Sequence, residues 1–406
     1  MGSALKRGTC EIEHTATPYC RYCAGAQSSS GGGGTQSGDP THRRMCEHRS
    51  HSTNGVRAHW RDDVRARVRE HLTEFVATQC RTDLAGAKVD VAGDVLSDFV
   101  DGGKYVRSTF MYLGWLCGAQ EHEAALRASA SLELFHAFAL MQDDVMDESA
   151  LRRGRPSAHV SFSRWHRQRG LTGSSDRFGE SAAILLGDLC LVWSEKMLRE
   201  SGVDADALAR VWPRYDDMRT ELAIGQFADL VNDCHSFPTL DAVLDVLRRK
   251  SGNYSVRRPV EIGAAMAGCR PQVLDALAGY GSAIGEAFQL RDDLLGVFGS
   301  QKVTGKSVGT DLTAQKATSV VVAAHQLADT ALRRQLSDLM STPELGPRDA
   351  ERWRDMITVS GAVQWIEELI EERLNQALAC LDIAGIPEIT RAALEDMAVA
   401  CTKREA

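Results

Sequence analysis

Apolar residues recur at helical spacing from about His59 almost to the end of the chain, and this pattern restricts the fold more than any other feature. Val64, Val68, Leu72 and Phe75 mark one face of a first helix, with arginine and glutamate between them. No alternating run of the kind that marks a half-buried strand competes with this periodicity. The sequence therefore predicts an all-α protein.

Further segments of three turns or more share the pattern, and glycines and prolines mark the breaks between them. The predicted helices cover residues 121–149, 181–200, 205–233, 240–268, 272–299, 313–340 and 361–382. Because the gaps between them are short and nothing resembles a long linker, we expect one helical domain over residues 57–406.

The N-terminal segment, residues 1–56, differs from the rest in composition. A low-complexity run at residues 28–34 cannot bury enough surface to fold alone, so we predict a disordered extension. The alternative is a small zinc site built from the cysteines and histidines of this segment. These are Cys10, His14, Cys20, Cys23, His42, Cys46 and His48. Only Cys20 and Cys23 form a C-x-x-C pair, and Cys46 and His48 stand too close together for the usual second pair.

Charge and hydropathy exclude other classes of protein. The 406-residue chain has a formal charge of −8, with 43% hydrophobic and 25% charged residues, which argues against a nucleic-acid binder. No run approaches the roughly 18 to 20 apolar residues of a membrane span, and the start lacks the apolar run of a secretory signal. Seven of the 11 cysteines are scattered, without short spacing, through segments that are predicted to be helical, as is usual in reduced proteins. We therefore expect a cytoplasmic location.

The first candidate site is a pair of aspartates at the end of an apolar helix. Asp143 and Asp147 are four residues apart, so they share one helix face at a separation of about 6 Å. A solvated acidic helix end is the simpler interpretation. However, residues 132–141 before the pair are strongly apolar, which indicates that the carboxylates end a core helix.

A second acidic pair, Asp292 and Asp293, ends another apolar helix much later in the chain. Facing carboxylates are costly without cations, and Mg²⁺ binds one or two carboxylates together with phosphate oxygens and water. The two motifs together therefore point to a diphosphate substrate that is held through metal ions.

Basic residues follow each acidic pair and a glycine pair, as expected for an anion site. They are Arg152, Arg153 and Arg155, then Lys306 and Lys316, and finally Lys104 and Arg107 after Gly102 and Gly103. Arginine forks match phosphate oxygens in bidentate fashion, and paired glycines let the backbone approach an anion.

These motifs resemble those of the trans-isoprenyl diphosphate (polyprenyl) synthases, the farnesyl and geranylgeranyl diphosphate synthase group, over roughly residues 60–400. Residues 102–107 resemble the family's GGKRxRP element, residues 143–156 its first aspartate-rich motif and residues 288–299 its second. Gly187-Asp188, and Gly225-Gln226 with Asp229, sit where the family has its GD and GQ pairs. The chain departs from the family at Tyr105, Ser108, Ser251 and Gly296, which stand for arginine, proline, threonine and a third aspartate.

The resemblance implies a single large bundle of antiparallel helices around a central cavity, the isoprenoid synthase fold, and a magnesium-dependent, homodimeric prenyltransferase. Its two substrates would be isopentenyl diphosphate and an allylic diphosphate. The implied metal ligands, for three Mg²⁺ ions, are Asp143, Asp147 and Asp292, with Asp144 and Asp293 in support; Lys250 joins the first three as a catalytic residue. Isopentenyl diphosphate would be bound by Lys104, Arg107, His136 and Arg153. The allylic substrate would be bound by Arg152, Lys250, Ser251, Gln289, Lys306 and Lys316.

Helix geometry supports His136 independently, because it lies two turns before Asp143 on the same face. Phe138, beside the small Ala139, lies about 7 Å deeper than Asp143 along the helix, where a ring would limit product length. Phe138 as an ordinary core residue is the alternative. In family terms this pair matches a C20 product, geranylgeranyl diphosphate, with the C15 farnesyl diphosphate as the next choice.

Two other functions compete with this prediction. A class I terpene cyclase also uses an aspartate-rich helix, but its second metal motif is incomplete here, since Leu240 occupies the glutamate position. A non-catalytic partner subunit would be expected to have lost one acidic motif, and both motifs are present.

Overall fold

The computed structural model describes residues 40–403 apart from 88, 234–236, 300–311, 313–314 and 343–344, with side chains from Trp60 onward except at 233 and 347. The chain divides into two compact units, residues 1–52 and 53–406, and the division falls within the first helix. The description below concerns the second unit. The predicted boundary after residue 56 stays a prediction, and Lys306 lies outside the described residues.

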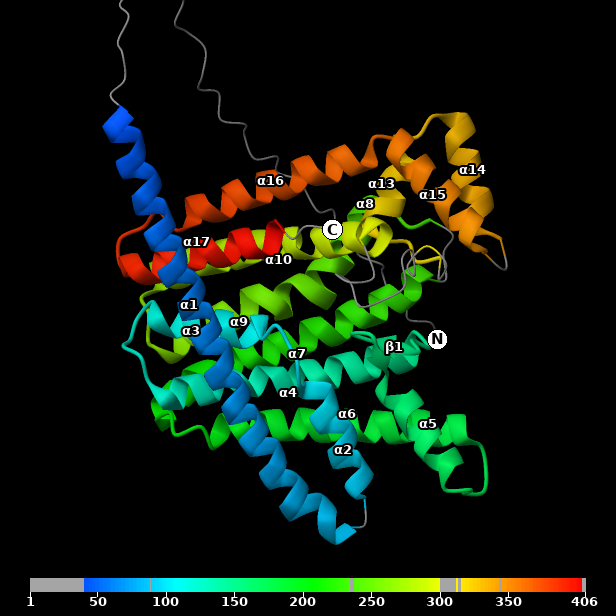
Figure 1. Ribbon diagram of the computed structural model, residues 1–406, viewed down its shortest axis with the longest axis horizontal. Helices are drawn as coiled ribbons and strands as arrows, with labels where there is room; N and C mark the ends of the chain where they lie inside the picture. Colours follow the sequence, from blue (N-terminus) through cyan, green and yellow to red (C-terminus); the bar gives the residue numbers. More distant parts are fainter. Residues whose placement is uncertain are drawn as a thin grey trace, which may run out of the picture. The chain divides into compact units, whose positions relative to one another are not determined.

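The described chain is almost entirely helical (Figure 1), which confirms the predicted fold class. The helices are α1 (Pro40–Gln79), α2 (Asp90–Val100), α3 (Val106–Leu116), α4 (Glu123–Met146), α5 (Ala158–Gln168), α6 (Ser175–Arg199), α7 (Ala205–Asp233), α8 (Leu240–Val246), α9 (Arg258–Met266), α10 (Pro271–Phe298), α13 (Ser319–Leu327), α14 (Thr330–Met340), α15 (Pro347–Val359), α16 (Ala362–Cys380) and α17 (Glu388–Thr402). Wider π-helical turns form η1 (Cys80–Leu84) and η3 (Leu247–Arg257), and η2 (Ala85–Ala87) is a 3₁₀ turn. One two-residue antiparallel pair joins β1 (Leu151–Arg152) to β2 (Arg155–Pro156).

Two long helices form the centre of the bundle, α4 and α10. Helix α4 packs against α3 and α6, and α10 packs against η3, α9 and α16. Both are buried on most of their faces, which is why their sequences are apolar all round. Figure 1 shows α4, α6, α7 and α10 running roughly along one direction, with the part of α1 after residue 52 crossing them.

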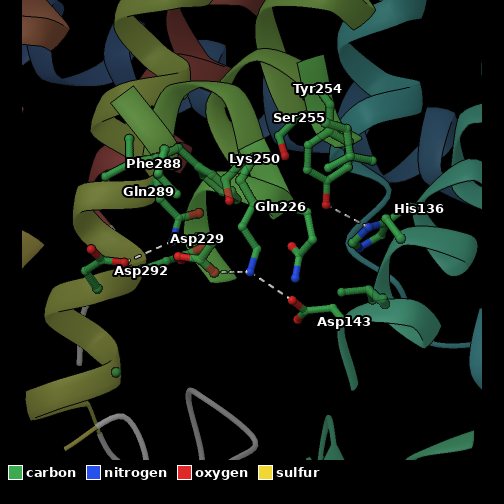
Figure 2. A pocket seen from close by; sticks show the side chains of 18 of the residues that line it. His136, Asp143, Gln226, Asp229, Lys250, Tyr254, Ser255, Phe288, Gln289 and Asp292 are labelled. Atoms are coloured by element: carbon green, nitrogen blue, oxygen red, sulfur yellow. Dashed lines mark hydrogen bonds and ion pairs between the residues drawn. The ribbon is translucent and has the colours of Figure 1, made fainter. Parts of the chain in front are cut away.

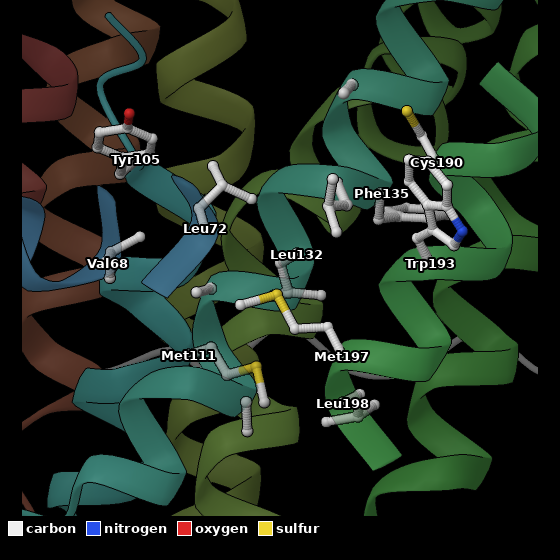
Figure 3. Packing of buried hydrophobic residues seen from close by; sticks show 14 of the residues in the cluster. Val68, Leu72, Tyr105, Met111, Leu132, Phe135, Cys190, Trp193, Met197 and Leu198 are labelled. Carbon is white, nitrogen blue, oxygen red and sulfur yellow. The ribbon is translucent and has the colours of Figure 1, made fainter. Parts of the chain in front are cut away.

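The core beside α4 joins it to α1 and α6. Leu72 of α1, Leu132 and Phe135 of α4, and Trp193 of α6 are each at most 3% exposed. Figure 3 shows these side chains interleaved between the three helices. This packing fixes the rotation of α4 about its axis, and therefore fixes the face on which its polar residues lie.

The structure differs from two of the predicted helices. The predicted helix over 313–340 begins only at Ser319, since residues 315–318 are not helical, and it is broken between α13 and α14. At the break Ala328 is extended, and the Asp329 side chain caps α14 by accepting from the Leu332 N–H at 2.8 Å. The predicted helix over 240–268 changes into the π-helical η3 in its middle. No helix in the described part of the chain is both long and apolar enough to cross a membrane.

Candidate active site

A cavity of about 640 Å³ opens between α4, α7, η3 and α10, next to the start of α3. Asp143 and Asp147 line it from the α4 side, and Asp292 and Asp293 line it from α10. In Figure 2, Asp143 and Asp292 lie on opposite sides of this pocket. The two acidic motifs that the sequence predicts to face one another therefore share one hollow.

One face of α4 supplies much of the wall. Glu133, His136, Leu140 and Asp143 all line the cavity, at the three- and four-residue spacing of a single helix face. Asp147 is the C-cap of the helix and lines the cavity too. The structure thus places His136 in the same cavity as Asp143.

Lys250 bridges two carboxylates across the cavity (Figure 2). Its Nζ lies 2.9 Å from Asp143 Oδ1 and 2.6 Å from Asp229 Oδ2. Burial alone would raise the pKa of Asp143, but the charges of Lys250 and Arg152 hold it below the ordinary range. Burial would lower the pKa of Lys250, but Asp143 and Asp229 raise it. Lys250 is therefore a cation and Asp143 an anion at neutral pH.

The backbone around Lys250 comes unusually close to α7. A Cβ at Gly225 would lie 2.4 Å from the Lys250 backbone nitrogen, so any side chain there would separate the two elements. The glycine of the predicted Gly225-Gln226 pair thus permits the contact, and Gln226 and Asp229 follow on the cavity side of α7.

Asp144 lies apart from the other motif aspartates. It is 0% exposed, and the Arg152 Nε donates to its Oδ1 at 2.9 Å and to its Oδ2 at 3.2 Å. Burial would lower the pKa of Arg152, but the Asp144 carboxylate raises it. Each helical residue is rotated by about 100° from the last, so Asp144 cannot face the way Asp143 does. The placement differs from the predicted metal-supporting role, because Asp144 is not among the described residues that line the cavity.

Lys316 connects the segment after the second motif to the first. Its ammonium forms an ion pair with the Asp147 carboxylate, and both residues line the cavity. Burial would lower the pKa of Lys316, and the charge of Asp147 raises it. Lys250, Arg152 and Lys316 therefore all contact carboxylates of the first motif.

The second motif is held by a neighbouring helix. Asp293 accepts hydrogen bonds from the Ser319 hydroxyl at 2.6 Å and the Ser319 N–H at 3.1 Å, at the start of α13. Gln289 donates to the other oxygen of Asp293 at 3.0 Å. Asp293 thereby fixes the end of α10, on which Asp292 is carried.

A basic group occupies the end of the cavity near α3. Lys104, Arg107 and Arg153 line it with His136. Arg107 donates to Tyr254 Oη at 2.6 Å and lies 4.3 Å from the centre of that ring. Burial, together with the positive charges of Arg107 and Arg153, lowers the pKa of His136 well below its ordinary value. His136 is therefore neutral, and can donate one N–H.

The two residues predicted to control product length are placed differently. Ala139 lines the cavity, but Phe138 is not one of the described residues that do. The Phe138 ring instead packs against Phe135, with centroids 5.8 Å apart, and Phe135 packs against the cavity residue Tyr254 at 6.2 Å. A five-residue step from Asp143 rotates Phe138 away from the shared face, whereas the four-residue step to Ala139 does not.

Several cavity residues were missed as functional candidates from the sequence. Tyr254 and Ser255 both accept hydrogen bonds from Arg107, and Glu133 accepts from Ser108. The sequence marks Asp229 only as part of a motif and does not indicate its contact with Lys250. Helical spacing from His136 and Asp143 could have found Glu133, but no local pattern indicates that η3 meets α3.

The donor set fits magnesium. Carboxylate oxygens are the ligands that Mg²⁺ prefers, and Asp143 Oδ1 is buried with an ion-pair partner but no hydrogen bond. Among the described residues, no three acidic, histidine or cysteine side chains converge closely enough to form a metal site alone. Mg²⁺ usually completes its coordination with phosphate oxygens and water, so two opposed aspartate motifs suit a metal bound together with a diphosphate.

The helical bundle and its two opposed aspartate motifs define an isoprenoid synthase fold. The model of the polyprenyl synthetase family matches residues 90–356, and the chain belongs to this family of prenyltransferases. A geranylgeranyl diphosphate synthase of Mycobacterium tuberculosis is 33% identical over 292 residues, which cover 71% of this chain and 77% of that protein. A (2E,6E)-farnesyl diphosphate synthase of Mycobacterium bovis is 28% identical over 307 residues, covering 75% and 80%.

A solved structure of a geranylgeranyl pyrophosphate synthase is also similar to this chain. The crystal structure of geranylgeranyl pyrophosphate synthase from Corynebacterium glutamicum, complexed with isoprenyl diphosphate and magnesium, is 37% identical with a TM-score of 0.80. The match covers 83% of this chain and 98% of that one.

Proposed function

We propose that this prenyltransferase condenses isopentenyl diphosphate with an allylic diphosphate to form a short all-trans prenyl diphosphate, with geranylgeranyl diphosphate (C20) as the main product. The observation that carries the proposal is that Asp143 and Asp292, from helices far apart in the sequence, line one cavity together with basic residues.

The allylic diphosphate would lie between the two aspartate motifs. Magnesium, with three ions expected, would be held by Asp143 and Asp147 on one side and by Asp292 on the other, and would neutralise the diphosphate. Lys250, Arg152 and Lys316 already contact the first-motif carboxylates. Once Asp143 and Asp147 bind metal, Lys250 and Lys316 could turn to diphosphate oxygens, and so could the Arg152 N–H groups that Asp144 does not hold. Ser251 and Gln289 also line the cavity, and Lys306 stays a prediction.

Isopentenyl diphosphate would lie at the other end, on Lys104, Arg107, Arg153 and the neutral His136. The three cations match an anionic diphosphate, with arginine forks for its oxygens. Because His136 lies two turns before Asp143 on α4, this arrangement would bring the two substrates end to end.

The reaction needs no side-chain nucleophile. The allylic C–O bond breaks, with its electron pair leaving on pyrophosphate, and the double bond of isopentenyl diphosphate forms the new C–C bond. A proton then leaves C2 of the isopentenyl unit for the departing pyrophosphate. Lys250, Arg152 and Lys316 stabilise the negative charge that develops on the leaving group. The apolar side chains of Ala139 and Leu140 in the wall would help to shield the allylic cation from water, which would otherwise quench it.

Product length is the finer part of the proposal. The relatives named above include both a geranylgeranyl and a farnesyl diphosphate synthase, so C15 is the alternative to C20. Ala139 is a small residue in the cavity wall, next to the aspartates of α4. The ring of Phe138 packs against Phe135, and Phe135 packs against the cavity residue Tyr254. Both features support a prenyl product of intermediate length, C15 to C20.

A homodimer is also part of the proposal. Helices α6 and α7 present large apolar side chains to solvent: Leu185, Val192, Ile224, Phe227 and Val231 are 49% to 73% exposed. An exposed apolar surface of this kind typically marks a protein interface, and a second copy of this chain is the expected occupant. A cytoplasmic location stays an expectation.

The decisive experiment supplies the purified chain with isopentenyl diphosphate, Mg²⁺ and each allylic starter in turn, and sizes the dephosphorylated products. Linear C20 alcohol is the expected result. A cyclic hydrocarbon would support the terpene cyclase alternative, and no product from the pure chain would overturn the assignment. Omitting Mg²⁺ or adding a chelator should abolish turnover.

A further inference from the structure

The loop that carries Lys104 and Arg107 has an unfavourable backbone conformation. Tyr105, the N-cap of α3, has φ 50° and ψ 41°, which is the left-handed region that a bulky residue rarely adopts. Such a conformation persists only where surrounding contacts hold it. Lys104 and Arg107 flank Tyr105, so these contacts also determine where the two cations point.

Two of these contacts run through Glu133, and the Thr109 hydroxyl adds another by donating to the Tyr105 carbonyl at 2.7 Å. The Glu133 Oε1 accepts hydrogen bonds from the Ser108 hydroxyl at 2.7 Å and from the Ser108 N–H at 3.1 Å. Ser108 is 0% exposed and Glu133 is 6% exposed, so water does not replace these bonds. The Tyr105 carbonyl oxygen also lies 3.0 Å from the Ser108 hydroxyl, so the single hydroxyl proton is shared between this carbonyl and Glu133, and Ser108 links Glu133 to the strained residue.

This arrangement follows from helix physics. The first N–H groups of a helix have no partner within it, and a negative charge near them is favourable. Ser108 is in the first turn of α3, and the Glu133 carboxylate comes from α4 to accept its N–H. A proline at position 108, the residue usual in the resembling family, could donate neither bond. The contact therefore depends on this chain's own serine.

We propose that Glu133 is a positioning residue of the isopentenyl diphosphate site: it holds Ser108, and through it the loop that presents Lys104 and Arg107 to the substrate. This inference rests on the proposed binding of isopentenyl diphosphate by those two cations. Glu133 lines the cavity, but its negative charge would repel a diphosphate. It acts instead through Ser108.

The test measures the effect of each substitution on the two substrates separately. KM for isopentenyl diphosphate and KM for the allylic diphosphate are measured in Glu133→Ala, Glu133→Gln and Ser108→Ala, with calorimetric binding of isopentenyl diphosphate as a second readout. We expect KM for isopentenyl diphosphate to rise roughly tenfold in Glu133→Ala, because two buried hydrogen bonds to a charged group are lost. Ser108→Ala should show a smaller rise. Glu133→Gln, which keeps an acceptor oxygen, should restore most of the affinity. KM for the allylic substrate should stay within about twofold.

Glu286→Ala is the matched control. Glu286 is also buried, at 8% exposure, accepts from Arg373 Nε at 2.9 Å, and is not among the described residues that line the cavity. Its loss should lower the melting temperature without raising KM for isopentenyl diphosphate. If Glu133→Ala behaved like Glu286→Ala, the positioning role would be overturned. Should Glu133→Ala not fold, an unchanged KM in Ser108→Ala would overturn it equally.

Arg107→Ala distinguishes this inference from the function on which it rests. An unchanged affinity for isopentenyl diphosphate in Arg107→Ala would show that the substrate binds elsewhere, and the proposed site would fail. A large loss in Arg107→Ala, together with no effect in the Glu133 and Ser108 variants, would overturn only the role of Glu133.

Discussion

Lys250 and Asp143 form an ion pair across the cavity, with Nζ and Oδ1 2.9 Å apart, and Asp229 lies on the other side of the same ammonium group. The pair joins η3 to α4 and places a cation where the diphosphate of the allylic substrate is proposed to bind. If a metal ion took the place of Lys250 at Asp143, Asp229 would still hold the ammonium group in the cavity.

Replacing Lys250 by alanine should therefore affect chemistry more than binding. We expect kcat to fall roughly 10²- to 10³-fold, because a preorganised donor to the leaving group is lost. Steady-state kinetics with saturating substrates measure this. The control is Arg248→Ala, which removes an exposed cation two residues away on the same element and should keep wild-type kcat. A kcat within about threefold of wild type in Lys250→Ala would contradict the proposed role.

The two adjacent aspartates of the first motif should respond differently to substitution. Asp143→Asn removes a cavity carboxylate, so we expect kcat/KM to fall roughly a hundredfold or more and the Mg²⁺ concentration needed for half-maximal rate to rise. Asp144→Asn instead breaks a buried pair with Arg152, which should cost about 3 to 5 kcal/mol of unfolding free energy. Magnesium titrations and denaturant unfolding of both variants check this contrast. Equal effects of the two variants in both measurements would contradict it.

The sequence predicts the helices and their faces well, because rotation by about 100° per residue is a local property. It therefore places Asp143, Asp147 and His136 on one face. It does not show which distant helices meet, so the contacts of Asp229 with Lys250 and of Tyr254 with Arg107 come only from the fold. The break at Asp329 was also missed, because a side-chain cap competed with an apolar pattern that continues on both sides.

Product length should change in opposite directions at the two neighbouring positions on α4. Phe138→Ala removes the ring that packs against Phe135, which in turn packs against the cavity residue Tyr254. Because this would loosen the cavity wall, we expect longer products than wild type. Ala139→Phe places a ring directly in the cavity wall and should shorten them. Chromatography of the dephosphorylated alcohols measures both. Phe162→Ala, which removes a buried ring on α5, is the control and should leave product length unchanged. An unchanged length in Phe138→Ala would show that Phe138 is an ordinary core residue.

His136 should make the protein less stable in acid. Its pKa is lowered in the folded state, so below about pH 6.5 the unfolded chain binds a proton that the folded chain does not. The unfolding free energy should then fall by up to about 1.4 kcal/mol for each pH unit below 6.5, until the folded-state pKa is reached. His136→Gln lacks this contribution, so its stability relative to wild type should improve as the pH falls from about 7.5 to about 5. Denaturant unfolding at several pH values measures the difference, and a constant difference would contradict the lowered pKa.

The exposed apolar surface of α6 and α7 should control self-association. Phe227 is 73% exposed, and Phe227→Lys would place a charge in the proposed interface, so we expect a shift from dimer to monomer. Sedimentation velocity measures this shift. Val359→Lys introduces the same charge at a residue that is 78% exposed on α15, and should leave the dimer intact. A monomeric wild type, or a dimer that Phe227→Lys does not affect, would contradict the proposed interface.

The wide turns of η3 also restrict which insertions and deletions the protein can tolerate. Lys250, Ser251, Tyr254 and Ser255 all reach the cavity from these turns, which contain more residues than α-helical turns of the same height. Losing a single residue from Leu247–Arg257 would tighten the spiral and swing either the ammonium or the phenol out of the cavity. We therefore expect an insertion or a deletion in this stretch to displace several cavity side chains at once, whereas a point substitution alters one of them.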